Sequence, residues 1–282
     1  MTSAARLFQI CYDTATRDAV DPDFEPLDNA AGERPDWFEY WPIQRFLRTA
    51  ALDENTFYGF FSPRFFGKTG LRGAQVREFL QTVDHADVVT FSPHPCHCAC
   101  FINVFEQGNA FYPGIRDTAV AFLREVDPGF NMDTFVTHSR NTVFSNYFVA
   151  RPVFWRRWLS LCERLVSHAD SPASPLYAEL SIRHEYRKEG GPAMSVQRKV
   201  FLLERLVSYL LHVGKDTVVN YPPFSLPLSD RFVGHLPDLV ELDRLKLAFC
   251  DSGDARHLYA YADLRGRVLR GAYDRMEPTT VA

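Results

Sequence analysis

The sequence lacks any apolar run long enough to cross a membrane. Its most apolar helical stretch, VFLLERLVSYLLHV at 200–213, is interrupted by Glu204 and Arg205, whereas a spanning helix needs ~20 mostly apolar residues. The opening residues, MTSAARLFQICYD, also lack the apolar segment of a signal peptide. We therefore expect a cytoplasmic protein, in which the six cysteines are reduced thiols rather than disulfides.

An excess of positive charge is also missing, because 31 Lys and Arg face 35 Asp and Glu, for a net charge of −4. Proteins dedicated to nucleic acids usually carry a basic face, so we expect no nucleic-acid partner. The C-terminal tail is a local exception, with Leu and Tyr among Arg256, Arg265, Arg267, Arg270 and Arg275. Such a segment is either a plain surface helix or a peripheral contact with the cytoplasmic face of the inner membrane.

Zinc and redox motifs of the usual spacing are absent as well. In FSPHPCHCACFINVFEQG, at 91–108, Cys96, Cys98 and Cys100 are spaced i, i+2, i+4, whereas zinc and redox cysteines usually have two residues between them. On an extended segment the three thiols would share one face and pack as small hydrophobic groups. We interpret them as structural, and a metal- or redox-responsive site over His94–Cys100 is the alternative.

What the sequence does contain is an alternation of strand and helix patterns, which predicts an α/β protein with a sheet covered on both faces. Residues 17–35 read as a loop, and the apolar spacing from Val196 to Leu211 predicts one amphipathic helix. We expect strands at 6–12, 56–62, 87–91, 142–150 and 217–221, and helices from about 41 and at 73–84, 115–126 and 151–168.

Ligands of such sheets bind at the carboxyl ends of the strands, and several candidate residues follow predicted strands. Arg64 and Lys68 lie in FSPRFFGKTG, at 61–70, which is no P-loop because Ser62 replaces the required first glycine. Their cations could hold a diphosphate or simply face solvent. His94 could bind a divalent metal or a phosphate, or be an ordinary loop histidine.

Two carboxylates are candidates for a general base. Asp133 lies in the loop GFNMDTF, and Glu106 lies among amides and aromatic rings in NVFEQGNAFYPG, a mixture suited to a sugar. Capping of a turn is the alternative role for Asp133. Glu204 and Arg205 lie within an apolar helical pattern. Either side chain could extend into a buried cleft, or both could simply face solvent.

Four segments, in their order along the chain, resemble bacterial glycosyltransferases of surface-polysaccharide gene clusters, in particular small GT-A-like proteins associated with capsule and O-antigen synthesis. They cover most of residues 6–212 and comprise FQICYD, LDNAAGERPDWFEYWPIQRFL, FYGFFSPRF, and NTVFSNYFVARPVFWRRWLSLCERL with FLLERLVSYLL. The resemblance implies one GT-A-like domain over 1–282, on a Rossmann-like mixed sheet. Residues 1–150, approximately, would bind the nucleotide-sugar, and the mostly helical part at 151–282 would face the acceptor.

The resemblance further implies transfer of a hexose from a nucleotide-sugar, most simply a UDP-sugar, to a hydroxyl of a surface glycan. The nucleotide would then be contacted at its edge by Gln9, Cys11 and Tyr12. The donor sugar or its diphosphate would be contacted by Asp28, Asn29, Arg64 and Lys68. Inverting and retaining mechanisms both remain open. The alternative is a non-catalytic carbohydrate- or protein-binding module that kept the fold.

One departure from the family pattern bears on metal dependence. The Asp-x-Asp motif usual in GT-A enzymes is missing, and Phe91–His94 stands in its place. Three interpretations follow: His94 helps to bind Mn²⁺ or Mg²⁺, or Arg64 and Lys68 neutralise the diphosphate without a metal, or the chain is an inactive relative.

Overall fold

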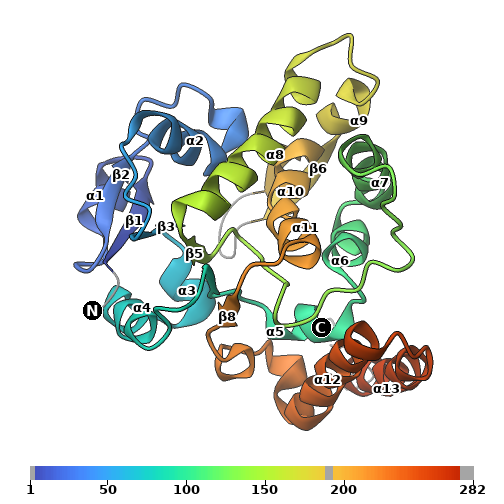
Figure 1. Cartoon of the computed structure of the whole chain (residues 1–282). Helices are drawn as coiled ribbons and strands as arrows, with labels where there is room; N and C mark the ends of the chain where they lie inside the picture. Colours follow the sequence, from blue (N-terminus) through green and yellow to red (C-terminus); the bar gives the residue numbers. More distant parts are fainter. Residues whose placement is uncertain (1–3, 188–192, 274–282) are drawn as a thin grey trace, which may run out of the picture.

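The computed structural model describes residues 4–187 and 193–273 and has the predicted α/β architecture, a mixed sheet flanked by helices (Figure 1). The main sheet has the strand order β2-β1-β3-β5-β4-β8. Its strands are β1 (Ala5–Cys11), β2 (Glu25–Asp28), β3 (Phe57–Phe61), β4 (Val88–Thr90), β5 (Phe148–Ala150) and β8 (Val218–Asn220). A separate antiparallel pair consists of β6 (Arg183–Arg187) and β7 (Ala193–Gln197).

Helices surround the sheet and form most of the C-terminal part. The α-helices are α1 (Thr14–Asp18), α2 (Tyr40–Thr49), α3 (Phe65–Thr69), α4 (Gly73–Gln81), α5 (Pro95–Cys100), α6 (Val104–Phe111), α7 (Ile115–Val126), α8 (Pro152–Asp170), α9 (Tyr177–Ser181), α10 (Arg198–Leu203), α11 (Leu206–Val213), α12 (Leu236–Ser252) and α13 (Arg256–Tyr273). Short 3₁₀ turns lie at Pro35–Trp37, Pro223–Ser225 and Asp230–His235. No helix in the described part of the chain is long and apolar enough to cross a membrane.

Strand polarity decides which loops meet. β1 runs parallel to β2 and β3, and β4 runs parallel to β8, while β5 is antiparallel to both of its neighbours, β3 and β4. The carboxyl ends of β1, β3 and β4 therefore lie at the same edge of the sheet as the amino end of β5. Side chains from four loops far apart in the sequence converge at this edge.

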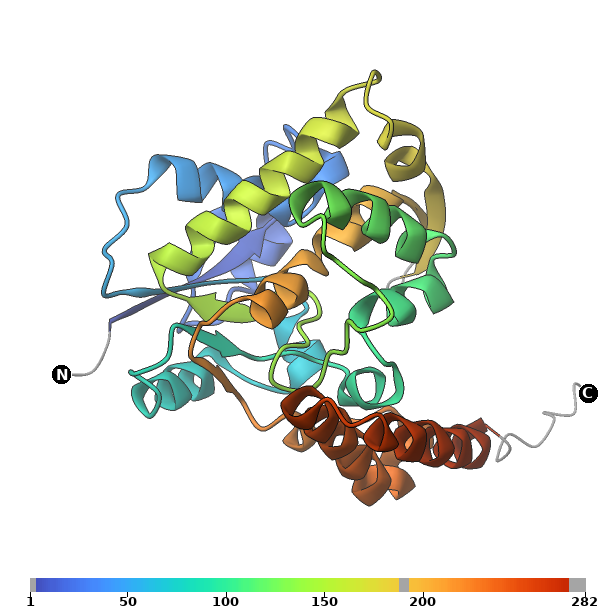
Figure 2. The ribbon, with the colours of Figure 1, turned by 45° about the vertical axis from the view of Figure 1, so that its right-hand side comes forward.

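Alternating side chains of the strands bury both faces of the sheet. On one face Phe8 and Phe60 pack with Trp155 of α8, whose indole nitrogen donates to the Tyr58 carbonyl at 2.9 Å. On the other face Leu7 and Phe61 pack against α3 and α4. A third cluster joins α5 to α12 and α13, the two helices that lie together along one side of the molecule in Figure 2.

The predicted strands at 6–12, 56–62, 87–91 and 217–221 and the helices from about 41 and at 73–84, 115–126 and 151–168 are confirmed within a few residues. Residues 17–35 are not only a loop, since they contain the end of α1 and the edge strand β2. The strand expected at 142–150 is shorter, because a turn with left-handed backbone at Ser145 (φ 60°) and Asn146 (φ 53°) delays its start.

The single helix expected from Val196 to Leu211 is wrong. The chain leaves β7, forms α10, and interrupts the helix at Glu204 and Arg205 before α11. The buried Arg205 guanidinium donates to the carbonyls of Val104 (2.9 Å) and Phe201 (2.6 Å), so that a carbonyl of the last turn of α10 is satisfied by a side chain. The cysteine segment is likewise a helix, α5, rather than extended, with Pro95 in its first turn.

Candidate functional site

The carboxyl edge of the sheet gathers charged and aromatic side chains. Tyr12 follows β1, Arg64 and Lys68 follow β3, and His94 follows β4. Two hydrogen bonds tie the cations to other segments, from Lys68 Nζ to Ser145 Oγ at 2.7 Å and from Arg64 Nη1 to the Tyr186 hydroxyl at 3.2 Å. The topology thus brings together Tyr12, Arg64, Lys68 and His94, four of the residues selected from the sequence.

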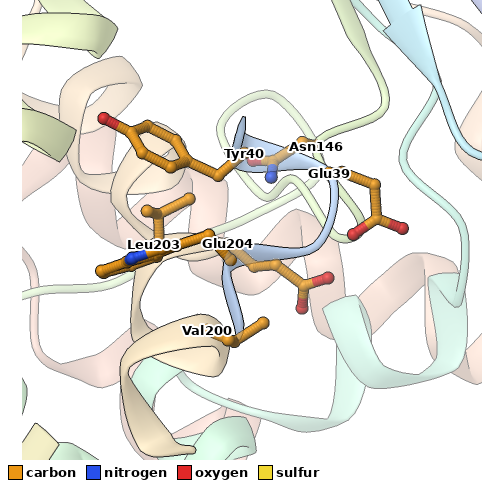
Figure 3. Close-up of a pocket in the computed structure, with 7 residues that line it drawn as sticks. Glu39, Tyr40, Asn146, Val200, Leu203 and Glu204 are labelled. Carbon is orange, nitrogen blue, oxygen red and sulfur yellow. The ribbon is translucent and has the colours of Figure 1, made fainter. Parts of the chain in front are cut away.

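A small pocket opens at this edge, between the entry to α2 and the break between α10 and α11. Figure 3 shows the carboxylates of Glu39 and Glu204 pointing to the same side of the pocket, whereas the Tyr40 hydroxyl points away from them. The lining residues are Trp37, Glu39, Tyr40, Asn146, Val200, Leu203 and Glu204.

Glu204 is the chemically distinctive group of the pocket. Burial raises its pKa above the usual value of a glutamate, the charge of Lys68 acts in the opposite direction, and the charge of Glu39 raises the pKa further. A carboxylate with a raised pKa is a stronger proton acceptor than a solvated one. The charge of Glu204 in turn raises the pKa of Lys68, against the larger effect of burial.

The cations and tyrosines form the rest of the wall. Burial lowers the pKa of Lys68, whose ammonium group lies 5.5 Å from the centre of the Tyr147 ring. The Tyr147 hydroxyl is 2.6 Å from Ser62 Oγ. Burial, and then the charge of Glu39, raises the pKa of Tyr12 well above its usual value, so this phenol stays protonated and offers a hydrogen bond rather than a charge.

His94 stands at the start of α5 in a left-handed conformation (φ 62°). Its pKa is lowered to about 3 by burial and then by His97, Lys68 and Arg64, so the ring is neutral near pH 7. The two nearby cations also repel a metal ion. Within residues 4–187 and 193–273, no three His, Cys, Asp or Glu side chains are placed to hold a metal together, so the neighbours of His94 do not fit the divalent ion that its position suggests.

The two carboxylates selected from the sequence lie elsewhere. Asp133 is exposed and pairs with Arg116 at 2.9 Å. Glu106 accepts a hydrogen bond from the Ile102 backbone N–H at 2.6 Å and pairs with Arg265 at 3.0 Å. Both carboxylates therefore already have partners, and neither lines the pocket that contains Glu204.

The remaining selected residues form the end of β1 and β2, where Cys11 pairs with Asp28 in the strand register. The Gln9 amide oxygen accepts from the Asp21 backbone at 2.9 Å, and Cys11 is buried. Asp28 accepts from the Ala30 backbone at 2.9 Å and pairs with Arg17 at 3.1 Å, while the Asn29 backbone donates to the Cys11 carbonyl at 2.8 Å. Gln9 also lines a second pocket, of about 500 Å³, with Phe24, Phe66 and Arg72.

None of the residues that line the pocket was selected from the sequence as a site residue. Glu39 reads as a helix-capping residue, and Asn146 lies in an expected strand. For Glu204, the sequence left open whether the side chain reaches a buried cleft or faces solvent. The signals that could have found them are a helix pattern interrupted by a charged pair, Glu204–Arg205, and an asparagine, the residue type that best tolerates left-handed backbone after glycine.

The cysteines pack in the core, and three of the C-terminal arginines form ion pairs. Cys96, Cys98 and Cys100 are buried, and burial raises the pKa values of Cys98 and Cys100 to about 12, so these thiols stay protonated and pack in the core. Arg275 lies outside the described residues. The ion pairs of the tail are Arg256–Asp254, Arg265–Glu106 and Arg267–Asp263.

The interpretation of this site rests on its geometry, since comparison of the chain with family models, curated proteins and solved structures found no match.

Proposed function

We propose that the chain is a GT-A-like glycosyltransferase that moves a hexose from a UDP-sugar to a hydroxyl of a bacterial surface glycan. One observation carries the proposal: Glu204, whose pKa is raised by burial, lines a pocket at the edge of a mixed α/β sheet where Arg64 and Lys68 follow β3. Ligands of open α/β sheets bind at this edge.

The proposed reaction assigns the base to Glu204. Its carboxylate takes the proton of the acceptor hydroxyl while the acceptor oxygen forms a bond to the anomeric carbon. The bond between that carbon and the diphosphate oxygen breaks, and the diphosphate leaves with the electron pair. A single displacement of this kind inverts the anomeric centre.

The cations Arg64 and Lys68 stabilise the negative charge that builds up on the leaving diphosphate. Such fixed charges at the developing anion are usually the largest single contribution to catalysis. Both side chains are positioned before any ligand binds, by the hydrogen bonds to Tyr186 and Ser145. The protonated phenol of Tyr12, after β1, is an additional donor at the same edge.

The first test is nucleotide binding by thermal shift with UDP, GDP and CMP, each with and without Mn²⁺. A ligand that binds the native state raises its melting temperature, and we expect UDP to stabilise the protein without Mn²⁺. Substitution Lys68→Met should weaken UDP binding about tenfold, because one charge-assisted contact is lost. Substitution Glu204→Gln should leave UDP binding unchanged.

The second test is slow hydrolysis of UDP-glucose or UDP-galactose, with water as the acceptor. Loss of the base should reduce this rate ~100-fold or more in Glu204→Gln. Glu54→Gln is the matched control, since Glu54 is a surface residue paired with Arg156. Failure of all three nucleotides to bind would refute the transferase and favour a carbohydrate-binding module.

A further inference from the structure

A line of hydrogen bonds runs from the break between α10 and α11, through α6, to His97 in α5. Arg205 Nη2 donates to the Gln107 amide oxygen at 2.6 Å, and the Gln107 amide nitrogen lies 3.2 Å from His97 Nδ1. The side chains of Arg205 and Gln107 are buried. This line fixes where the protons lie as well as where the side chains lie.

The proton positions follow from the chemistry of the first member of the line. A guanidinium group only donates hydrogen bonds, so the Gln107 atom beside Arg205 is the oxygen and the atom beside His97 is the amide nitrogen. An amide nitrogen also only donates, so Nδ1 of His97 accepts and carries no proton. The imidazole ring is then neutral, with its one proton on Nε2.

The surroundings of His97 keep the ring in this state. Burial, and then the charge of Arg205, lowers its pKa to about 4. The rings packed around it lie with their centres 5.3–6.3 Å away and belong to His94, Phe101, Phe111 and Phe144. These neighbours offer no negative charge to offset a second proton, and a proton on Nδ1 would point at the N–H₂ group of Gln107.

The Nε2–H group of His97 is available to a ligand. The ring is partly exposed, and no residue in the described part of the chain accepts a hydrogen bond from Nε2. Phe144, which lies edge-on to the ring at 6.3 Å, directly precedes Ser145, and Ser145 accepts from Lys68 Nζ at 2.7 Å. The donor therefore lies beside the turn that positions one of the two cations at the carboxyl edge of the sheet.

The fixed proton limits the chemistry open to His97. Nε2 carries the proton and the lone pair of Nδ1 faces Gln107, so neither nitrogen is free to bind a metal ion or to accept a proton. A neutral imidazole can instead donate a hydrogen bond to an oxygen atom without any transfer of the proton. An oxygen of a ligand is therefore the partner that this group suits.

We propose that His97 donates a hydrogen bond from Nε2 to a phosphate oxygen of the bound nucleotide, and that Gln107 and Arg205 are positioning residues that fix the proton there. This proposal rests on the proposed transferase function, in which Arg64 and Lys68 hold the diphosphate at the same edge. A neutral donor adds a directed contact to the anion. A positively charged ring would add one too, but its charge would oppose those of the two cations.

The first test reads the proton position in the unmodified protein without a ligand. NMR of the full chain labelled with ¹⁵N-histidine distinguishes protonated from unprotonated ring nitrogens, and His97→Phe identifies the His97 signals by their loss. We expect a neutral ring with its proton on Nε2 from pH 6 to 8. A proton on Nδ1, or titration near the ordinary histidine pKa of 6.5, would overturn the proposal.

Gln107→Glu tests the positioning role with a side chain of nearly the same shape. The new carboxylate can accept from Arg205 and also from His97, so we expect the proton to appear on Nδ1. Asn109→Asp is the matched control, because Asn109 lies in the same helix and its side-chain oxygen already accepts from the Gly114 backbone at 2.9 Å. An unchanged His97 spectrum in Gln107→Glu would show that the line does not fix the proton.

The second test asks whether a phosphate oxygen meets this proton, with UDP and pyrophosphate as separate probes. We expect UDP to shift the His97 Nε2 and Nε2–H signals. His97→Phe keeps an aromatic ring without the donor, so it should bind UDP about tenfold more weakly. His85→Phe is the control, since His85 is exposed and precedes β4, at the opposite end of that strand. Melting temperatures verify that each variant is folded.

UDP that binds without shifting the His97 signals, or that binds His97→Phe as tightly as wild type, would contradict the contact. If UDP does not bind the wild-type protein at all, the transferase proposal and the nucleotide contact are both wrong. Pyrophosphate then decides the rest: a shift of the His97 signals supports a phosphate donor, and its absence overturns that as well. Because the proton position is measured without a ligand, its failure is distinct from failure of nucleotide binding.

Discussion

At the scale of single residues, the adjacent charges Glu204 and Arg205 have opposite roles. The Arg205 guanidinium is buried and bonded to two carbonyls and to the Gln107 amide oxygen at 2.6 Å. Glu204 lines the pocket, and no hydrogen bond joins its side chain to another residue of the described part of the chain. One residue therefore stabilises the break between α10 and α11, and its neighbour is free to take part in chemistry.

This division predicts separate effects on stability and activity. Arg205→Met should reduce the free energy of unfolding by about 3–5 kcal/mol, because several buried acceptors lose their donor. Urea denaturation followed by circular dichroism measures the change. Equal losses of stability in Arg205→Met and Glu204→Gln would contradict it.

The raised pKa of Glu204 predicts a dependence of stability on pH. A carboxyl group whose pKa is higher in the folded state binds its proton more readily there, so folding is most favourable when the group is protonated. Its penalty on stability is absent below its ordinary pKa of 4.5 and grows as pH rises through the folded pKa.

Glu204→Gln should therefore be more stable than wild type at pH 7, and the difference should disappear near pH 4. Urea unfolding of both proteins from pH 4 to 8 tests this. A stability difference that is constant over that range would show that the ionisation of Glu204 does not differ between the folded and unfolded states.

At the scale of elements, strand β3 depends on the absence of a side chain at Gly59. A Cβ atom there would lie 2.7 Å from Val149 Cγ2 in β5 and 3.2 Å from Leu7 Cδ2 in β1. β3 lies between β1 and β5 in the sheet. Close approach of the neighbouring side chains therefore selects glycine at this position.

Gly59→Ala should reduce the free energy of unfolding by about 1–3 kcal/mol through overpacking. The matched control is Gly67→Ala in α3, where a Cβ atom would meet nothing within 4 Å and where alanine favours the helix by up to ~1 kcal/mol. Chemical denaturation of both variants measures the contrast, and a tolerated Gly59→Ala would show that β1 and β5 can move apart.

The same scale shows what local sequence patterns predict well. Strong apolar periodicity correctly predicted helices α7 and α8, and short apolar runs with polar boundaries correctly predicted strands β1 and β3. β2, with only four residues and one apolar side chain turned inward, carries too weak a pattern to be found. The interruption between α10 and α11 depends on the Arg205 contact with Val104, a hundred residues away, which no local pattern contains.

At the scale of the whole molecule, four residues selected by the strand-end rule lie at one edge of the sheet, whereas the residues that line the pocket there could not be predicted. Arg64, Lys68 and His94 follow strands, so the strand-end rule reaches them. Glu39, Asn146 and Glu204 come from a helix entry, a turn before an antiparallel strand and a helix break. They meet only because β5 runs antiparallel to its neighbours and because the entry to α2 and the end of α10 line the same pocket. Neither arrangement is encoded in a short motif.

The docking of α12 and α13 onto α5 belongs to this scale too. Lys246 of α12 is fully buried and donates to the carbonyls of Cys98 and, at 2.9 Å, Phe101. Cys96 and Cys100 pack against the same helix pair. The C-terminal helices therefore cover the cysteine segment.

This docking predicts the thiol reactivity of the folded protein. Five cysteines are buried and Cys250 is exposed, so a maleimide reagent at pH 8 should label one thiol quickly and the other five slowly, through opening of the fold. The mild alkalinity is needed because partial burial raises the pKa of Cys250 as well.

Cys250→Ser should remove the fast reaction, and all six thiols should react in urea. Fast labelling of Cys96 or Cys100, identified by mass spectrometry, would mean that α12 and α13 leave α5 in solution, and the buried ammonium group of Lys246 would then lose its carbonyl partners.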